Sequence, residues 1–134
     1  MKYSTTGFTD DELAVITVAE KFLGGIAKRD KVAMLSLILP SGGATLIRND
    51  APISITLVGV VERIPFDYPQ KMSEIISAQP TVRVDRDIAM AWTPYEFYMD
   101  GVLHHVGTNI WSFWKKDGKW VISGLADNSR TPDV

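Results

Sequence analysis

The sequence predicts an α+β fold in which N-terminal helices pack on one face of a curved antiparallel sheet. Apolar residues recur at helical spacing over positions 10–29, ahead of three strand-like runs between Ile88 and Arg130. Two Asp-Gly pairs, Asp100-Gly101 and Asp117-Gly118, join these runs. An Asp-Gly pair tolerates the positive φ angles of a two-residue hairpin turn, so the last third of the chain is predicted to be an antiparallel meander.

The earlier elements are predicted from caps, apolar spacing and prolines. Thr9 and Glu12 form a capping box at the start of the first helix. The segment from Ser54 to Ile64 fits a strand by its β-branched residues, or a helix capped by Thr56, and we favour the helix. Two further helices and two strands are expected over Lys31 to Leu39, Gln70 to Ala78, Ala44 to Arg48, and Thr81 to Asp85.

Two adjacent glycines, Gly24 and Gly25, interrupt the first helix. Each glycine costs a helix about 1 kcal/mol relative to alanine, so the pair needs a reason. Close packing, an early end of the helix, or space left for a ligand would each supply one.

Length and composition exclude several classes of function. The chain of 134 residues is expected to form one domain over residues 1–134. A net charge of −2 gives no field for nucleic acid or anionic lipid, and no apolar run or leader predicts a membrane partner. We therefore expect a cytoplasmic protein. Without cysteine, and with two histidines on different faces, no metal site is predicted.

The turn at Asp100-Gly101 sets a register that separates two faces of the sheet. Continuous pairing from this turn places Glu96 opposite His105 and Trp92 opposite Asn109. This first face resembles the lining of a ligand cavity, with aromatic walls and a few polar groups. It includes Met90, Trp92, Glu96, Tyr98, His105, Asn109, Trp111 and Asn128. The second face is more apolar and suits contact with another protomer; it includes Ala89, Ala91, Thr93, Tyr95, Phe97, His104, Val106, Ile110, Trp114 and Asp127. One β-bulge would turn Asp127 to the first face.

Several motifs in the last third of the chain resemble the nuclear transport factor 2-like superfamily. They are the run from Trp92 to Phe97, His105 to Asn109 with its Val-Gly-Thr core, the Asp-Gly-Lys-Trp ending at Trp120, and Gly124 to Arg130. The branch they resemble most is the SnoaL-like one, with scytalone dehydratases and ketosteroid isomerases. The resemblance implies a cone-shaped, cystatin-like sheet with helices on its concave face, a pocket between them, and a homodimer through the outer sheet face.

The resemblance also suggests a role for Asn109, which occupies a position similar to a ligand-binding asparagine of scytalone dehydratases. Two departures limit the comparison. Gly24-Gly25 lies near the place of a first-helix carboxylate or tyrosine in those enzymes, and Trp92 lies near that of their strand histidine. The fold is therefore expected to transfer, whereas the acid–base set is not.

The function predicted is a cofactor-independent isomerase, cyclase or dehydratase of specialised metabolism. It would act by acid–base chemistry on an oxygenated, largely apolar small molecule. His105, polarised by Glu96, would move a proton while Asn109 orients the reacting group, with Asp127 as a further candidate. Binding residues are expected among Trp92, Trp111, Tyr98, Met90 and Asn128. The alternative is a non-catalytic dimeric module that binds a ligand or another protein on the same fold.

Overall fold

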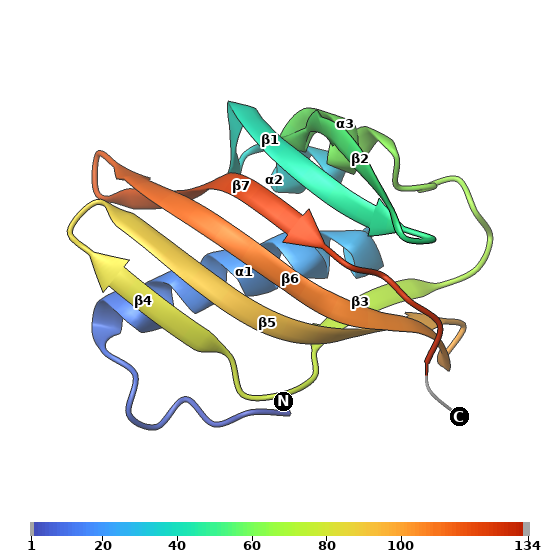
Figure 1. The fold of residues 1–134 in the computed structure, drawn as a ribbon, viewed down its shortest axis with the longest axis horizontal. Coiled ribbons are helices and arrows are strands. Elements are labelled where there is room, and N and C mark those ends of the chain that lie inside the picture. The colour runs from blue at the N-terminus through green and yellow to red at the C-terminus, as the bar shows by residue number, and fades with distance from the viewer. Residues whose placement is uncertain (1, 133–134) are drawn as a thin grey trace.

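Helices lie against one face of a seven-stranded sheet (Figure 1). The structure is a computed structural model that describes residues 2–132. In chain order its elements are α1 (Asp10–Lys28), α2 (Lys31–Leu35), β1 (Ile38–Arg48), β2 (Ala51–Thr56), α3 (Leu57–Glu62), β3 (Met72–Ile76), β4 (Thr81–Asp85), β5 (Ile88–Met99), β6 (Val102–Lys116) and β7 (Lys119–Asp127).

The strands follow the order β2-β1-β7-β6-β5-β3, and β4 pairs with the remaining part of β5. Neighbouring strands are antiparallel except β1 and β7, which run parallel. The expected antiparallel sheet is therefore a mixed one. β1 and β7 lie far apart in the chain, so no hairpin turn dictates their relative direction.

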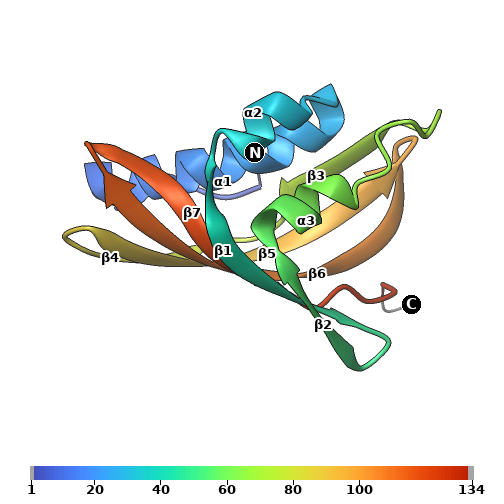
Figure 2. The same cartoon turned by 90° about the horizontal axis from the view of Figure 1, so that it is seen from above.

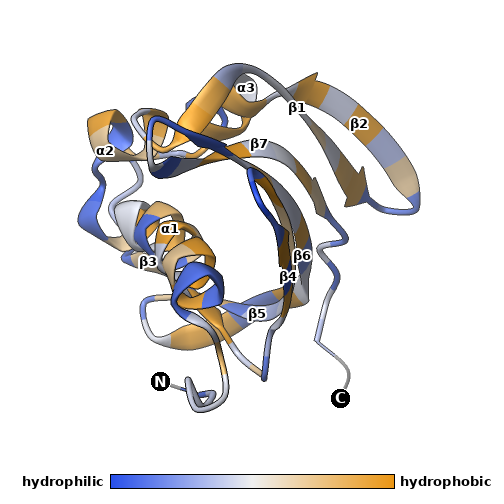
Figure 3. Cartoon of the chain, turned by 90° about the vertical axis from the view of Figure 1, so that its left-hand side faces the viewer, coloured by the Kyte–Doolittle hydropathy of each residue, from blue (hydrophilic) through white to orange (hydrophobic). Residues whose placement is uncertain are grey.

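The sheet curves around α1, which lies on its concave side (Figures 2 and 3). The predicted capping box is present, because Thr9 Oγ1 accepts from the Glu12 amide and the Glu12 side chain accepts from the Thr9 amide. Helical spacing gives α1 one apolar side, and that side enters the core through Val15, Ile16, Ala19, Phe22, Leu23 and Ile26. The predicted α+β architecture is confirmed.

Three predicted helices differ from the structure. The segment from Gln70 to Ala78 contains the strand β3, whose residues Met72 and Ile76 are buried beside β5. The helix predicted over Lys31 to Leu39 is shorter in the structure, where α2 ends at Leu35 and β1 begins at Ile38. Pro40 lies within β1, where the pairing of β1 with β7 is irregular. The segment from Ser54 to Ile64 is divided between the strand β2 and the helix α3, with Thr56 capping α3 through the Gly59 amide.

Both Asp-Gly turns form as predicted, but neither register continues unbroken. Met99 pairs with Val102 and Lys116 with Lys119, and all four turn residues have positive φ. On β6, Leu103 pairs with Tyr98 and His105 with Phe97, so His104 is an extra residue. On β7, Ser123 is extra in the same way. Beyond each bulge the two strands no longer pair in the register that the turn sets. Residues predicted to share one face of the sheet therefore lie on opposite faces.

The outer face of the sheet carries large apolar side chains that remain exposed. Ile88, Trp92 and Ile110 are 59%, 46% and 43% exposed, and Met90 and Trp114 lie in the same rows. We call these five residues the outer apolar patch. The predicted apolar outer face therefore exists, but β5 contributes Met90 and Trp92 to it rather than Ala91, Tyr95 and Phe97.

Candidate functional site

A cavity of about 270 Å³ lies between α1, α3 and the concave face of the sheet. Ligand pockets usually measure about 300–1,000 Å³, so this cavity suits a small organic ligand. The apolar part of the wall comes from Phe22, Leu23, Ile26, Leu46, Val60, Ile64, Pro65, Met72, Phe97, Trp111 and Leu125. The polar groups are Arg48, Arg63, Glu74, His105, Asn109 and Asp127.

The two bulges decide which polar groups reach this cavity. Beyond Ser123 the side chains of β7 change faces, so Asp127 lies opposite the inward-facing Asn109. Beyond His104 the pairing of β5 shifts, so Thr93 lies opposite Asn109 and Tyr95 opposite Gly107. The predicted second face is therefore wrong for Asp127 and for the inward-facing residues of β5.

Asp127 is held between a phenol and a guanidinium. Tyr95 donates its hydroxyl to Asp127 Oδ1 at 2.7 Å, and Arg48 Nη2 donates to Oδ2 at 2.9 Å. A Cβ at Gly107 would lie 2.7 Å from the Tyr95 ring, so this glycine makes room for the tyrosine rather than for a ligand. Burial, followed by the charge of Asp127, raises the pKa of Tyr95, which therefore stays a hydrogen-bond donor.

Glu74 on β3 supplies a second carboxyl group. Asn109 Nδ2 donates to Glu74 Oε2 at 2.8 Å. The pKa of Glu74 is raised to about 8, chiefly by burial; the nearby Asp127 charge also raises it, while the Asn109 hydrogen bond and Arg48 lower it. Glu74 keeps some accessible surface because it lines the cavity. At neutral pH this carboxyl group is therefore mostly protonated.

His105 lies in an aromatic setting at the same cavity. Its ring stacks on Phe97 with centroids 4.4 Å apart, and its Nδ1 lies 2.9 Å from Nδ1 of His104. The pKa of His105 is lowered to about 4, chiefly by burial and then by the neighbouring His104, although Asp127 acts in the opposite direction. His105 is therefore a neutral imidazole at neutral pH.

The predicted pairing of Glu96 with His105 is wrong. Glu96 lies opposite Val106, and its carboxylate binds Lys2 Nζ at 2.6 Å and the Tyr98 hydroxyl at 3.1 Å. His105 lies opposite Phe97 instead. The bulge at His104 causes this change, and it removes the geometric basis for polarising His105 through Glu96.

The other predicted site residues divide between the cavity and the outside of the sheet. Asn109, Asp127, His105 and Trp111 line the cavity. Trp111 is fully buried, and its Nε1 donates to Thr93 Oγ1 at 2.9 Å. The remaining residues do not line it, since the register or the end of β7 places them elsewhere; these are Met90, Trp92, Glu96, Tyr98 and Asn128. Asn128 instead accepts from the Thr108 amide at 2.7 Å.

Glu74 was missed by the sequence reasoning, because its segment was assigned to a helix. The signal that could have found it is the alternation of Met72, Glu74 and Ile76, which places a carboxyl group in an otherwise apolar inward row. Arg48 and Arg63 also line the cavity.

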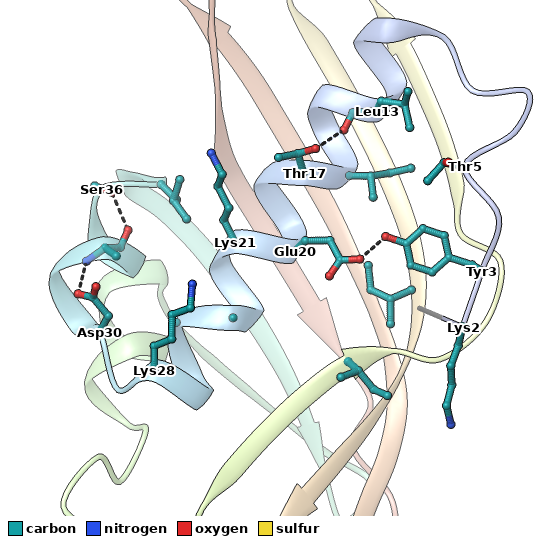
Figure 4. Close-up of a pocket in the computed structure, with 17 residues that line it drawn as sticks. Lys2, Tyr3, Thr5, Leu13, Thr17, Glu20, Lys21, Lys28, Asp30 and Ser36 are labelled. Carbon is teal, nitrogen blue, oxygen red and sulfur yellow. Dashed lines mark hydrogen bonds between the residues drawn. The ribbon is translucent and has the colours of Figure 1, made fainter.

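A larger groove of about 970 Å³ lies on the other side of α1 (Figure 4). We call it the outer groove, and we call the smaller cavity described above the inner cavity. It runs between the N-terminal segment, α1, α2 and β3. Its polar groups are engaged locally: the Tyr3 hydroxyl donates to Glu20, and Asp30 Oδ1 caps α2 through the Ala33 amide. Lys21 and Lys28 extend from α1 into the open (Figure 4).

Both glycines of α1 line the outer groove, and neither lines the inner cavity. A Cβ at Gly25 would lie 2.3 Å from Met34 Cγ, so this glycine allows α2 to pack closely on α1. A Cβ at Gly24 would meet nothing within 4 Å and would project into the outer groove. Close packing therefore explains Gly25, and neither glycine opens the inner cavity.

Within residues 2–132, no three His, Asp or Glu side chains are grouped to hold a metal ion. The polar groups of the inner cavity are instead arranged as hydrogen-bonding partners of one another. None of the helices in this part of the chain combines the length and apolar character needed to cross a membrane.

No family model matches the sequence, and no curated protein sequence matches it. Solved structures do resemble it. A putative calcium/calmodulin dependent protein kinase II association domain from Xanthomonas campestris superposes with a TM-score of 0.75 at 18% identity, covering 99% of this chain and 96% of its own. An NTF2-like protein of unknown function from Shewanella baltica gives 0.70 at 14% identity, covering 96% and 100%.

A protein of unknown function with a cystatin-like fold from Nostoc punctiforme gives a TM-score of 0.71 at 12% identity, with coverage of 97% and 96%. The chain has the nuclear transport factor 2-like fold. The fold that the sequence motifs implied is thereby confirmed. At these identities the likeness concerns the fold alone, and the SnoaL-like branch stays a prediction. The activity of a nuclear transport factor 2-like fold has to be argued from its cavity.

Proposed function

We propose that the inner cavity binds a small, oxygenated, largely apolar molecule and moves a proton within it without a cofactor. The reaction class is that of an isomerase, cyclase or dehydratase. The observation that carries the proposal is Glu74, a carboxyl group with a pKa of about 8 in a mostly apolar cavity. A group that titrates near the working pH can both give and take a proton, which makes it an efficient general acid or base.

Glu74 takes the role that the sequence had suggested for Glu96 and His105. Asn109 binds Glu74 Oε2 and so fixes the orientation of the carboxyl group. Oε1, which has no hydrogen-bond partner within residues 2–132, is left to meet the substrate. In the protonated state Glu74 acts as an acid toward a substrate oxygen, and once ionised it takes a proton from carbon.

The neighbouring groups support this proton transfer. Asp127 stays paired with Arg48 and Tyr95, and its charge helps keep the pKa of Glu74 high. Neutral His105 can donate a hydrogen bond to a carbonyl group of the substrate or accept one from a hydroxyl group, without adding a charge to the cavity. Phe97 and Trp111 offer aromatic surface to an apolar body.

Deuterium exchange into simple ketones tests the proposal. Enolisable ketones with apolar bodies, from cyclohexenone to phenylacetone, are incubated with the protein in D₂O, and loss of the α-proton signal is followed by NMR. We expect exchange above the buffer rate for part of this panel. Glu74→Gln, which keeps the shape but cannot ionise, should lower the rate at least about a hundredfold.

The control variant is Glu96→Gln, which removes a carboxylate on the outer side of the sheet and should leave the rate unchanged. Equal exchange by wild type and Glu74→Gln would reject Glu74 as the proton-transfer group. Absence of exchange across the whole panel would count against proton abstraction in this cavity and favour the alternative.

The alternative is a non-catalytic dimeric module that binds a ligand or another protein. The outer apolar patch favours association, since an exposed apolar surface of this kind marks interaction sites. One similar solved structure is described as a putative association domain. We propose that the patch joins two copies of the chain, an arrangement compatible with either function.

Sedimentation equilibrium tests this homodimer. The double variant Trp92→Lys and Ile110→Glu should yield monomer, because it places charges at the centre of the patch. Val102→Lys is the control, as Val102 is 69% exposed but lies at the β5–β6 turn, away from the centre of the patch. A wild-type protein that is monomeric at micromolar concentrations would contradict the proposed dimer.

A further inference from the structure

The charges around the inner cavity are not balanced. Arg48 is paired with Asp127, so this cation and this carboxylate compensate one another. Glu74 is mostly neutral at neutral pH because its pKa is about 8, and His105 is neutral because its pKa is about 4. One cation, Arg63, remains among the polar groups of the cavity.

Arg63 has no ion-pair partner among residues 2–132. It caps the C-terminus of α3 and is exposed while also lining the cavity, which places it at the rim. Its sequence neighbour Glu62 is engaged elsewhere, because its carboxylate binds Lys31 Nζ at 2.6 Å. The guanidinium of Arg63 is therefore free to bind a ligand.

A ligand that fills the cavity must cover part of this rim. A neutral ligand would displace water from the guanidinium without offering a charged hydrogen-bond partner in its place, and this desolvation would weaken binding. A carboxylate would replace that water with charge-assisted hydrogen bonds, and its geometry matches the planar donors of arginine. The deeper polar groups, Glu74 and Asn109, are uncharged and suit an oxygenated but neutral part of the ligand.

We propose that the ligand of the inner cavity is a small organic acid whose apolar body faces Phe97 and Trp111 and whose carboxylate binds Arg63 at the rim. This inference rests on the proposed function, since it names the substrate class of the same site. It assigns Arg63 to substrate selection and leaves proton transfer to Glu74.

The test compares two probes of nearly the same shape, 3-phenylpropanoate and 3-phenylpropanamide, by isothermal titration calorimetry at pH 7. The carboxylate should bind at least about tenfold more tightly than the amide, which corresponds to about 1.4 kcal/mol. Arg63→Gln should remove this preference by weakening carboxylate binding while amide binding stays the same. Added salt should reduce the preference in the wild type, because the rim is exposed.

Lys21→Gln is the matched control, since it removes an exposed cation from the opposite side of α1 and should leave the preference intact. Equal binding of both probes, a preference that survives Arg63→Gln, or no binding of either probe would overturn the inference. Its failure is distinguishable from failure of the proposed function. Equal binding would leave proton transfer by Glu74 in place, whereas deuterium exchange that survives Glu74→Gln would leave the Arg63 preference untouched.

Discussion

The inner cavity and the outer groove, which lie on opposite sides of α1, differ in the surroundings of their charged groups as well as in volume. The outer groove has a volume of about 970 Å³ and the inner cavity about 270 Å³. In the groove, charged side chains either pair with a local neighbour or extend from the surface (Figure 4). In the cavity, groups from β1, β3, β6 and β7 converge, and two of them have shifted pKa values.

This difference shows what makes a chemical site on this fold. Burial in the cavity changes the protonation of Glu74 and His105, which groups on an open surface would not experience. A hydrogen bond from Asn109 fixes the orientation of the Glu74 carboxyl group. Hydrogen bonds from Tyr95 and Arg48 fix that of Asp127. Convergence and desolvation, rather than volume, favour the inner cavity as the candidate site.

The strongest expected effect contrasts one aromatic residue from each side of α1. Trp111 is fully buried in the inner wall, so Trp111→Ala should lower the free energy of unfolding by about 3–5 kcal/mol. Tyr3 is only partly buried beside the outer groove, so Tyr3→Ala should lower the free energy of unfolding by less than about 2 kcal/mol. Urea denaturation measures both, and equal losses would show that the groove is as tightly packed as the cavity.

A smaller effect is expected in the pH dependence of stability. The Glu74 carboxyl titrates near 4.5 when unfolded and near 8 when folded, so between these values only the folded state keeps the proton. The free energy of unfolding therefore falls as the pH rises through this window. Glu74→Gln lacks this loss, and its stability relative to wild type should grow by on the order of 3 kcal/mol from pH 5 to 8.

The contribution of His105 has the opposite sign. Its folded pKa of about 4 lies below the ordinary 6.5, so its contribution rises with pH between those values. This contribution is present in both proteins and cancels in the difference. Glu96→Gln serves as the control and should show no growth above pH 5. A difference between Glu74→Gln and wild type that stays constant from pH 5 to 8 would mean that the folded carboxyl is already ionised.

The smallest effect concerns the two glycines of α1. Gly24→Ala should raise the free energy of unfolding by about 1 kcal/mol, because it favours the helix and its Cβ meets open space. Gly25→Ala should instead be destabilising by about 1 kcal/mol, since buried Met34 must move. Thermal denaturation distinguishes the two signs, and stabilisation by both would show that α2 packs loosely on α1.

The sequence predicted the architecture well because its signals there are local. The capping box of α1 and the two Asp-Gly turns depend on neighbouring residues, and all three form as expected. Alternation along one strand also placed His105, Asn109 and Trp111 on a common face, and all three line the cavity.

The partners of these residues could not be predicted from the turns. The bulges at His104 and Ser123 leave no clear mark in the sequence, yet each reverses the faces of the strand beyond it. This reversal turned Trp92 and Glu96 outward and Asp127 inward. Glu74 was missed for another reason: β3 is short, and pairing with β5 outweighs the helical propensity of its residues.

We predict that the inner cavity keeps the Glu74 carboxyl mostly neutral near physiological pH. A ¹³C NMR titration of the protein labelled at glutamate Cδ measures this directly, with Glu74→Gln assigning the signal. We predict a midpoint close to pH 8, well above that of Glu96 on the outer side of the sheet. A Glu74 midpoint near 4.5 would contradict the proposed role of Glu74, because the carboxyl would then be ionised at neutral pH and unable to act as an acid.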